Sequence, residues 1–574
     1  MSNRMEKGPS MENPEIARLL AETADLMEIA GEDPFRIRSY RNAAAAIENH
    51  PQRIVDILRD PSRDVTTIPG VGKSIAAALH EIAERGSFAR RDEMLAKYPP
   101  TALELLRIPG VGPKTVRALW EHYRVSTIED LARLCEEHRI RELRGMGPKT
   151  EQKILSGIAH YRQVAGRFLL SHAAAVAAEL APLVNGAPAG SFRRGRETVG
   201  DLDILSTDPD AIQRFLAHPS VHDVLAHGET KASARFGPEG LQVDVRLIPQ
   251  ESFGAALQYF TGSKEHNVAL RQRALKMGFT LNEYGLFTLE GEKRVAGPDE
   301  EGVYHALGLA WIPPELRENQ GEIEAAEHGA LPHLIEESDI RGDLHMHTLA
   351  SDGRATLEEM AAAARDRGYS YIAITDHSRA LAMANGLDEK RALAFAAEVR
   401  RFNQAGHAVH VFAGLECDIL RDGRLDLAED ALAQLDFVVA SVHSYMNLEP
   451  AEMTDRLLRA LESPSVRALA HPTGRVLLHR DAYAYEFETV AREAARRGVW
   501  FEINSSPERL DLHAALIRRA RQLGCRFVIS TDAHHPKHLA NIRFGVQMAR
   551  RGWLSPADVV NTLDLAAFRA ALQK

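Results

Sequence analysis

The chain has 574 residues, of which 45% are apolar and 26% are charged, and its formal net charge is −10. This length is too great for one hydrophobic core and predicts about three to five domains of an ordinary globular protein. No apolar run approaches the roughly 20 residues of a membrane span, and the first residues lack a secretory signal. Three scattered cysteines, Cys135, Cys417 and Cys525, exclude a disulfide framework and a four-thiolate zinc site. We therefore expect a cytoplasmic protein without a membrane partner.

The first third reads as short amphipathic helices, and one glycine-rich phrase occurs in it three times. The copies are Ile68-Pro-Gly-Val-Gly-Lys, Ile108-Pro-Gly-Val-Gly-Pro-Lys and Gly145-Met-Gly-Pro-Lys. A tight turn of this kind leaves backbone N–H groups at a helix N-terminus, where they can hold a phosphate oxygen. Any one copy could be an ordinary turn between helices, but three copies favour helix-hairpin-helix elements that grip the DNA backbone. The DNA-binding residues that this predicts are Gly70, Gly72, Lys73, Gly110, Gly112, Lys114, Gly145, Gly147 and Lys149.

The negative net charge, which argues against a nucleic-acid partner, conceals a basic segment next to these hairpins. Seven lysines and arginines lie between Arg139 and Arg167, against the two acids Glu142 and Glu151.

A pair of aspartates marks the next region. Asp201 and Asp203 lie two apart on a predicted strand, Asp201–Leu205, so both carboxylates face the same side. Asp244, on the predicted strand Leu241–Ile248, could complete a catalytic site for two Mg²⁺ or Mn²⁺ ions. Two such ions about 3.5–4 Å apart can activate an attacking hydroxyl and neutralise a leaving pyrophosphate.

The segment just before this pair supplies groups for a triphosphate. Gly190 and Ser191 offer backbone and hydroxyl donors, and Arg194 offers a charged fork. An isolated Asp-x-Asp is a weak signal because paired surface acids are common. Its combination with the preceding Gly-Ser and with Asp244 predicts a metal-dependent site.

This region resembles the palm of the family X DNA polymerases, the group of polymerase beta, and the likeness covers about residues 15–315. Downstream, Tyr259-Phe-Thr-Gly-Ser-Lys-Glu-His-Asn, Arg271 and Phe279-Thr-Leu-Asn-Glu-Tyr resemble the nucleotide pocket and thumb of that family. The resemblance implies that Tyr259 and Phe260 flank the sugar and that Asn267 reaches the base edge. It also implies that Arg271 contacts the template side of the minor groove. The nucleotide-binding residues are then Gly190, Ser191, Arg194, Gly200, Tyr259, Phe260, Gly262, Asn267 and Arg271.

One position departs from this family. In its lyase-competent members a lysine after the first hairpin forms a Schiff base with a sugar aldehyde, and the corresponding position here is Ala78, with Ser74 nearby. A Schiff base requires an amine. We therefore expect no 5′-deoxyribose-phosphate lyase by that route, and an amino-terminal domain that only binds DNA.

The second half alternates short apolar strands with helical patterns, which predicts a parallel sheet or barrel. The expected strands are Tyr371–Ile374, Val409–Phe412, Phe437–Ala440, Val499–Ile503 and Phe527–Ile529. Most of the nine candidate ligands directly follow such apolar runs: His345, His347, Asp352, His377, Glu416, His443, His471, Asp532 and His534. Because strand ends gather on one rim of a barrel, these side chains should converge.

Nine ligands exceed what one tetrahedral ion uses, so two or three ions are expected. Mixtures of histidine and carboxylate suit Zn²⁺, Mn²⁺ or Fe. A lone histidine is usually structural or exposed, and we expect this of His407, His410, His479 and His513.

The pattern resembles the PHP phosphoesterases and spans about residues 340–574. The resemblance implies a distorted (β/α)₇ barrel with a trinuclear site, and all nine expected ligands are present. It also implies a 3′–5′ exonuclease, with AP-endonuclease or 3′-phosphatase as further activities.

The expected fold class is multidomain α+β and α/β. The predicted domains are 11–90, an N-terminal helical DNA-binding domain with a helix-hairpin-helix; 91–166, a fingers-like helix-hairpin-helix domain; 167–258, a nucleotidyltransferase palm; 259–315, the thumb and nucleotide pocket; 316–338, a polar linker; and 339–574, the PHP domain.

The function that these features predict is gap filling coupled to end processing in base excision or strand-break repair. The expected partners are gapped or nicked duplex DNA and dNTPs, and the protein is expected to be a nucleoid-associated monomer. Two alternatives stay open: a phosphatase for a small phosphate ester, and a DNA-bridging scaffold with vestigial sites. A preference for free phosphomonoesters would favour the first, and purified protein without metal would favour the second.

Overall fold

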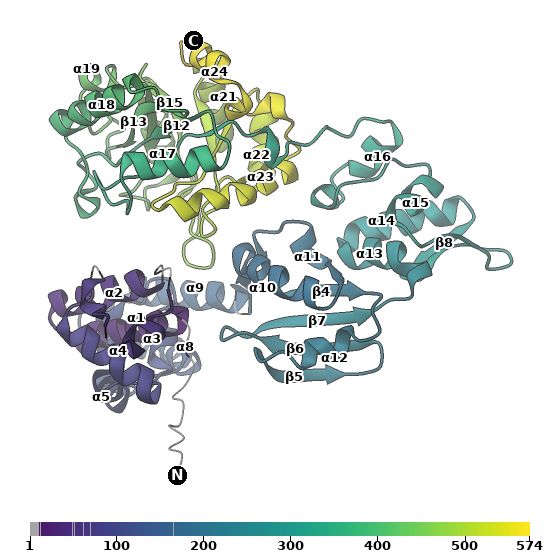
Figure 1. Ribbon diagram of the computed structural model, residues 1–574, viewed down its shortest axis with the longest axis horizontal. Helices are drawn as coiled ribbons and strands as arrows, with labels where there is room; N and C mark the ends of the chain where they lie inside the picture. Colours follow the sequence, from purple (N-terminus) through teal and green to yellow (C-terminus); the bar gives the residue numbers. More distant parts are fainter. Residues whose placement is uncertain are drawn as a thin grey trace. The chain divides into compact units, whose positions relative to one another are not determined.

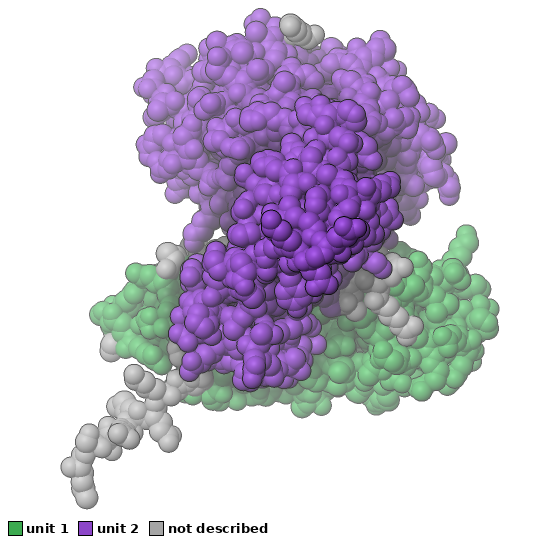
Figure 2. All heavy atoms as spheres, turned by 90° about the vertical axis from the view of Figure 1, so that its right-hand side faces the viewer, with its two compact units in different colours: residues 1–165 green, residues 166–574 purple. Residues whose placement is uncertain are grey.

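The structure is a computed structural model that describes residues 11–573 except Glu12, Asn49, Pro51, Pro61, Pro69 and Ala165. The chain divides into two compact units, residues 1–165 and 166–574, which Figure 2 colours separately. Across the described residues, every helix is too short or too polar to cross a membrane.

Unit 1 is helical and has one apolar core. Its helices are α1 (Asn13–Ala30), α2 (Pro34–Glu48), α3 (Ile54–Arg59), α4 (Lys73–Arg85), α5 (Ala89–Lys97), α6 (Ala102–Leu105), α7 (Pro113–Tyr123), α8 (Ile128–Glu136) and α9 (Pro148–Val164), with short 3₁₀ turns η1 (Val65–Thr67) and η2 (Arg139–Glu142). Leu20, Ile47, Leu79, Leu119 and Leu131 belong to one cluster of buried side chains. The segments 11–90 and 91–166, expected as separate domains, therefore share a core.

The palm forms a five-stranded sheet in unit 2. Its strands are β2 (Gly186–Pro188), β4 (Asp201–Ser206), β5 (Val221–His227), β6 (Lys231–Phe236) and β7 (Leu241–Leu247), in the order β2-β4-β7-β6-β5. The helices α10 (Leu170–Leu183) and α12 (Ala211–Leu216) pack on this sheet, and the short helix α11 (Gly190–Arg193) precedes β4. The strands β1 (Phe168–Leu169) and β3 (Thr198–Val199) pair beside it. β4 runs parallel to β7, an arrangement that Figure 1 shows at the centre of the sheet.

The thumb combines helices with a small sheet. It contains η3 (Gln250–Ser252), α13 (Phe253–Thr261), α14 (Lys264–Lys276), α15 (Glu300–Ala306) and the strands β8 (Phe279–Asn282), β9 (Gly285–Thr288) and β10 (Arg294–Ala296). The sheet order is β10-β9-β8.

The stretch expected as a polar linker, 316–338, is folded against the thumb. It contains α16 (Glu322–Glu327) and lies between the turns η4 (Pro314–Leu316) and η5 (Glu337–Asp339). Arg317 and Glu322 are buried, and they pair with Glu300 and His266 at 2.6 Å in each case. The charged residues that suggested a solvated linker include side chains buried in ion pairs. Composition alone does not reveal such partners.

The PHP region is a nearly closed barrel of seven parallel strands, as the sequence predicted. The strands, adjacent in chain order, are β11 (Gly342–Asp343), β12 (Tyr371–Ile374), β13 (His410–Asp418), β14 (Phe437–Ser441), β15 (Val466–Leu469), β16 (Trp500–Asn504) and β17 (Phe527–Ser530). A bridge between Met346 and Ala533 joins the first strand end to the last.

Helices surround this barrel, as Figure 1 shows for the larger ones. They are α17 (Leu357–Asp366), α18 (Glu389–Gln404), α19 (Glu429–Leu432), α20 (Pro450–Ala460), α21 (Phe487–Arg497), α22 (Ala514–Gln522), α23 (Ile542–Arg551) and α24 (Leu565–Leu572), with 3₁₀ turns η6 (Ala382–Ala384), η7 (Pro536–Asn541), η8 (Pro556–Asp558) and η9 (Val560–Thr562). All five strands expected in this half are present, and β11 and β15 were not predicted.

Candidate active sites and nucleic-acid interface

The three glycine hairpins of unit 1 adopt the same turn. In each copy the residue after the first glycine donates its N–H to the carbonyl oxygen three positions earlier, at 2.9 to 3.0 Å. The first glycines have left-handed backbone angles, with φ of +88° at Gly70, +90° at Gly110 and +85° at Gly145. Glycine reaches this region without a steric penalty, which explains why each copy carries it.

The second glycine of each hairpin is open to approach. A Cβ built on Gly72, Gly112 or Gly147 would meet no atom within 4 Å. Gly72 and Gly112 are the N-caps of α4 and α7, and neither has a side-chain cap. An exposed lysine lies in the first turn of each following helix: Lys73, Lys114 and Lys149. This geometry suits a phosphate oxygen at the backbone N–H groups with a cation beside it.

The palm brings its three predicted acids to neighbouring strands. Asp201 and Asp203 lie on β4, and the parallel strand β7 places Asp244 directly opposite Asp203. Two cations that sequence reasoning did not single out accompany them. Lys231 Nζ lies 2.5 Å from Asp244 Oδ2, and Arg246 Nε lies 3.7 Å from Asp203 Oδ1. Both residues could have been recognised in the sequence as basic residues in strand-like segments near the acids.

The surroundings shift the pKa values of the three carboxyl groups in different directions. Burial, together with the Asp201 carboxylate, raises the pKa of Asp203 to about 6. Burial and Asp244 also raise the pKa of Asp201. Burial alone would raise the pKa of Asp244, but hydrogen bonds from Lys231, Ser233 and Gln242 lower it. A raised carboxyl pKa next to like charge indicates a site that attracts cations.

The loop before β4 approaches these acids closely. Gly190 has a φ of +66°, and a Cβ there would lie 3.0 Å from Asp203 Oδ2, so this position favours glycine. Ser191 follows in α11, and Gly200 immediately precedes β4.

Arg194, predicted to face a triphosphate, is engaged within the protein. Its Nε donates to Glu318 Oε1 at 3.1 Å, and its Nη1 donates to the Thr261 carbonyl beside Gly262. Arg551 Nη1, from the barrel helix α23, donates to the Arg194 carbonyl at 2.6 Å and to Glu318 at 3.1 Å. A residue of the barrel therefore touches the predicted nucleotide loop.

The predicted sugar and base contacts differ in their exposure. Tyr259 and Phe260 end α13, with ring centroids 5.2 Å apart in an edge-to-face arrangement. Asn267 is only 9% exposed, and its amide bonds to the Tyr259 carbonyl and to Gln258, both at 2.7 Å. These hydrogen bonds of Asn267 join α14 to the end of α13. Arg271 is exposed on α14.

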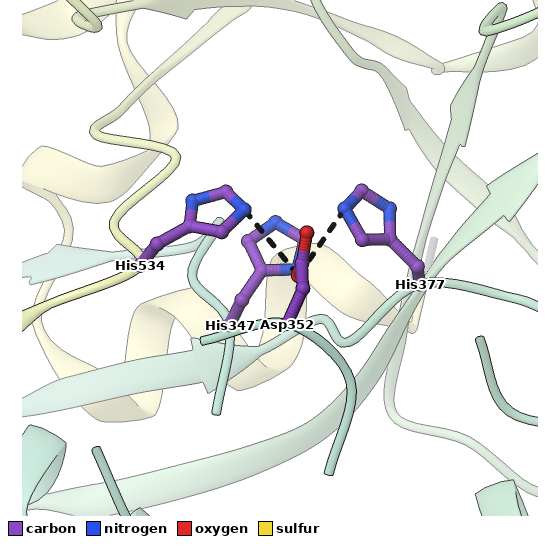
Figure 3. Close-up of side chains that lie close together, drawn as sticks. All are labelled: His347, Asp352, His377 and His534. Atoms are coloured by element: carbon purple, nitrogen blue, oxygen red, sulfur yellow. Dashed lines mark ion pairs between the residues drawn. The ribbon is translucent and has the colours of Figure 1, made fainter. Parts of the chain in front are cut away.

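The barrel gathers its predicted ligands where its strands end. Three groups of possible metal ligands occur in the described part of the chain, and all lie here: His347, Asp352, His377 and His534; His345, His347 and Asp532; and His377, Glu416 and His443. Figure 3 shows Asp352 between the rings of His377 and His534, at 3.6 and 3.4 Å. His347 and His377 each belong to two groups, so neighbouring ions would share ligands.

Glu416 is the centre of this arrangement. Its carboxylate lies within ion-pair distance of five histidines: His345 at 3.4 Å, His347 at 3.7 Å, His377 at 2.7 Å, His443 at 3.3 Å and His471 at 2.8 Å. The side chain is 1% exposed. A buried carboxylate among so many nitrogens can bridge two ions. His471 is not in the three groups, but its contact with Glu416 makes it a ninth candidate ligand.

The residues of this cluster fit metal ions. Several buried ligand atoms make no hydrogen bond, namely His345 Nε2, His347 Nδ1 and His471 Nδ1. Burial and two neighbouring imidazoles lower the pKa of His347 to about 3, so its ring is neutral. Burial would lower the pKa of His377, but Glu416 and Asp352 raise it to about 10. The carboxylates thus attract positive charge, and neutral imidazole nitrogen is the form that binds metal.

Two acids orient these histidines and were missed by sequence reasoning. Glu502 Oε1 lies 2.7 Å from His345 Nδ1, and Asp418 Oδ1 lies 3.1 Å from His443 Nδ1. Such contacts fix the tautomer and leave the other nitrogen for a metal. An acid inside the apolar strand Trp500–Asn504 was the available signal for Glu502. The four histidines expected to be structural or exposed, among them His407 stacked on Phe402, lie outside all three groups.

Family profiles match five successive segments of the chain. Residues 11–88 match a helix-hairpin-helix domain, 102–159 a SAM-like helix-hairpin-helix tandem, 167–244 the DNA polymerase beta palm, 256–318 the DNA polymerase beta thumb, and 343–506 the PHP domain. Together with the two sites, these matches define a family X DNA polymerase joined to a PHP phosphoesterase domain.

Three relatives sharpen this assignment. The chain is 36% identical over 575 aligned residues, 98% of its length, to the whole DNA polymerase/3′-5′ exonuclease PolX of Bacillus subtilis. It is 27% identical to rat DNA polymerase lambda over 53% of the chain and 56% of that protein. It is 29% identical to a probable phosphatase of Syntrophotalea carbinolica over 38% of the chain and 90% of that protein. The chain belongs to the PolX family, which confirms both predicted resemblances.

Proposed function

We propose that this protein fills short gaps in DNA with its palm and removes nucleotides from 3′ ends with its barrel. The observation that carries the proposal is that one chain holds two clusters of candidate metal ligands on two different folds. The register of β4 and β7 sets Asp203 opposite Asp244, and the barrel rim gathers nine candidate ligands. The similar protein of Bacillus subtilis is a DNA polymerase/3′-5′ exonuclease by name.

In the palm, Asp201, Asp203 and Asp244 would hold Mg²⁺ or Mn²⁺. Bound divalent ions there supply the charge that activates an attacking hydroxyl and stabilises a leaving pyrophosphate. The close approach of Gly190 to Asp203 sets the predicted triphosphate loop beside the acids. Phe260, under the Arg246 guanidinium at 4.6 Å, presents a ring surface near the same strands. These contacts support a nucleotide held against β4.

In the barrel, the nine ligands would hold two or three Zn²⁺, Mn²⁺ or Fe ions. Bound ions there supply Lewis acidity toward a phosphate ester. Glu502 and Asp418 keep the two imidazoles that they contact in one tautomer, and His345, His347 and Glu416 are buried. These features support cleavage of a phosphodiester, with AP-endonuclease or 3′-phosphatase as further end-processing reactions.

Unit 1 would bind the backbone of gapped or nicked duplex through its three hairpins. Ala78 is buried in α4 and offers no amine, which supports DNA binding without the lyase reaction. We place the protein in the cytoplasm, at the nucleoid, as a monomer.

One assay tests the two halves together. Purified protein is given a gapped duplex with dNTPs, in Mg²⁺ and Mn²⁺ in parallel, and both extension and 3′ degradation are followed. Asp201→Ala with Asp203→Ala should abolish extension and leave degradation. His345→Ala with His347→Ala should abolish degradation, reduce bound metal and leave extension. Extension in the first variant, or degradation with unchanged metal content in the second, would contradict the assignment of that site.

The match to a probable phosphatase favours a second candidate for the barrel, hydrolysis of a small phosphomonoester. A kcat/KM for a free phosphomonoester far above that for DNA 3′ ends would support this alternative. Equal or lower values would leave the exonuclease proposal in place.

A further inference from the structure

Two charged residues of the segment 317–322 are buried against the thumb. The sequence predicted a polar linker here, yet Arg317 and Glu322 are both 0% exposed, and Glu322 lies in the first turn of α16. Burial of a charge costs free energy that only close and well-placed partners offset. The partners of Glu322 therefore indicate what this segment does.

Glu322 contacts the first turn of α14, the thumb helix that carries Asn267 and Arg271. Its Oε1 lies 2.6 Å from Nδ1 of His266, a side chain that is also buried. The other ring nitrogen of His266, Nε2, lies 2.9 Å from the hydroxyl oxygen of Tyr304. His266 directly precedes Asn267, so this contact is made next to a predicted nucleotide-binding residue.

These two contacts fix the ring of His266 in one orientation. Burial lowers the pKa of His266, although Glu322 opposes that shift, so the ring is neutral. A neutral imidazole has one donor and one acceptor nitrogen. Nδ1–H therefore donates to the Glu322 carboxylate, and Nε2 accepts from the Tyr304 hydroxyl. Reversal of the ring would break both hydrogen bonds.

The same carboxylate also orders the backbone of its own segment. Glu322 accepts hydrogen bonds from the N–H groups of Asn319 and Gln320, at 2.9 and 2.6 Å. The carbonyl oxygen of Arg317 accepts the N–H of Ser263, the N-cap of α14, at 3.0 Å. One backbone contact and one side-chain contact thus tie this segment to the start of α14.

Hydrogen bonds continue from this turn of α14 to other predicted nucleotide contacts. Asn267 donates to the Tyr259 carbonyl and accepts from Gln258, both at 2.7 Å. Arg271 is exposed one turn further along α14. Residues four apart lie on the same face of a helix, so a shift of the first turn would move Asn267 and Arg271 together.

We propose that Glu322 and His266 are positioning residues for dNTP binding, which hold the start of α14 so that the base side of the pocket is preformed. This inference rests on the polymerase proposed above. Both residues act through Asn267 and its neighbours rather than by contact with the nucleotide. A pocket that is ordered in advance does not have to be ordered by its ligand, so the effect falls on dNTP affinity.

The triphosphate loop provides an internal reference for this proposal. Gly190 and Ser191 lie in α11, a palm helix, and Glu322 makes its hydrogen bonds elsewhere, to His266 and to its own segment. Tripolyphosphate resembles the phosphates of a dNTP but has no base or sugar. Its inhibition constant should therefore not depend on Glu322.

The test measures insertion of dTTP into a single-nucleotide gap by the full chain in Mg²⁺. KM, kcat and the inhibition constant of tripolyphosphate are determined for the wild type, for Glu322→Gln and for Tyr304→Phe. Glu324→Gln, at an exposed position of α16, is the matched control. Thermal unfolding is recorded for every variant.

Glu322→Gln replaces a charged acceptor by an amide, so KM for dTTP should rise about tenfold, with little change in kcat or in the tripolyphosphate constant. Tyr304→Phe loses one neutral hydrogen bond and should raise KM about threefold. Glu324→Gln should behave as wild type.

An unchanged KM in folded Glu322→Gln overturns the inference. An equal rise of KM and of the tripolyphosphate constant also overturns it, because that result indicates a general loosening of the fold. If Glu322→Gln does not fold, Tyr304→Phe decides by the same criteria. If the wild type inserts no nucleotide, the proposed polymerase fails and this inference fails with it.

Discussion

The palm and the barrel both collect acids for metal ions, but they reach that arrangement by different routes. In the palm, two of the three acids come from one strand, and Asp244 comes from a strand hydrogen-bonded to it. In the barrel, the ligands come from separate strand ends, and groups of three or four ligand atoms lie within 4.8 Å of one another. Most of the barrel ligands are buried, with Asp352 at the open side of the cluster, whereas in the palm Asp201 is exposed and Asp244 is paired with Lys231.

This difference corresponds to what each site has to bind. Mg²⁺ in a polymerase is held by one or two carboxylates together with substrate phosphates, so an open and incomplete protein site suffices. A centre that acts on an incoming strand without a triphosphate needs its ions held by the protein alone. The barrel would provide this with candidate nitrogen and oxygen ligands, two of which, His345 and His443, are oriented by Glu502 and Asp418.

The largest expected effect tests whether the barrel site depends on one central carboxylate. Glu416→Gln keeps the shape of the side chain but removes the charge shared by five histidines, so bound metal and 3′ degradation should fall to background. Gap filling should persist, since the palm does not use this residue. Metal analysis and the gapped-duplex assay measure both effects, with the exposed Glu462→Gln as the control. Full metal content in Glu416→Gln would show that the ligand groups are independent.

The next effect concerns orientation. Glu502→Gln should lower 3′ degradation by about 10- to 100-fold, because a carboxylate that fixes a metal-binding histidine contributes on this scale. The measurement is kcat for degradation together with metal affinity. Extension by the palm serves as the internal control, and its equal loss would indicate a folding defect.

A substitution in the barrel should have a smaller effect, on nucleotide binding at the palm. Arg551→Met removes the hydrogen bonds to the Arg194 carbonyl and to Glu318, so the nucleotide loop loses a support. We expect KM for dNTPs to rise about fivefold, the equivalent of roughly 1 kcal/mol, with 3′ degradation unchanged. Arg550→Met, which loses a bond to Glu315 at 2.7 Å, is a matched control. An unchanged KM would mean that the two sites are independent despite this contact.

The affinity of the hairpins for DNA should depend on ionic strength rather than on base sequence. The logarithm of affinity for gapped DNA should fall linearly with the logarithm of salt concentration, by about 0.9 per neutralised phosphate. Lys73→Ala and Lys114→Ala should each reduce that slope by about one. Fluorescence anisotropy over a salt series measures it, and strong dependence on base sequence would argue for a different mode of binding.

The last prediction concerns stability and should leave both activities nearly unchanged. The free energy of unfolding of the thumb should depend on pH. Burial would raise the pKa of Glu300, but Arg317 and Arg193 lower it to about 2 from an ordinary 4.5. The unfolded carboxylate therefore binds protons first as the pH falls, so this contribution is present above pH 4.5 and is lost between 4.5 and about 2. It corresponds to about 3 kcal/mol.

Urea unfolding at several pH values measures this term. Trp311 is a suitable fluorescent probe because its Nε1 donates to Glu300 at 2.8 Å. Glu300→Gln should be less stable at neutral pH, and its free energy of unfolding should no longer fall between pH 4.5 and about 2. An unchanged acid limb in this variant would place the dependence on other carboxylates.

The amino-acid sequence by itself determined the local features of this protein. Left-handed backbone favours glycine at Gly70, Gly110 and Gly190, and the sequence shows this in the hairpin phrases and in the Gly-Ser pair. The spacing of Asp201 and Asp203 fixes a common face because side chains alternate along a strand. The apolar runs before His377, Glu416 and Asp532 located three of the barrel strands.

Only the tertiary structure decided the features that join distant segments. The linker-like charges at Arg317 and Glu322 are buried because Glu300 and His266 lie opposite them, and nothing local indicates those partners. The buried amide of Asn267, the salt bridge that holds Arg194 and the contact with Arg551 likewise depend on packing between elements far apart in the chain. Spacing along a strand is set by backbone geometry, whereas the partner of a buried charge is set by the fold that removes it from water.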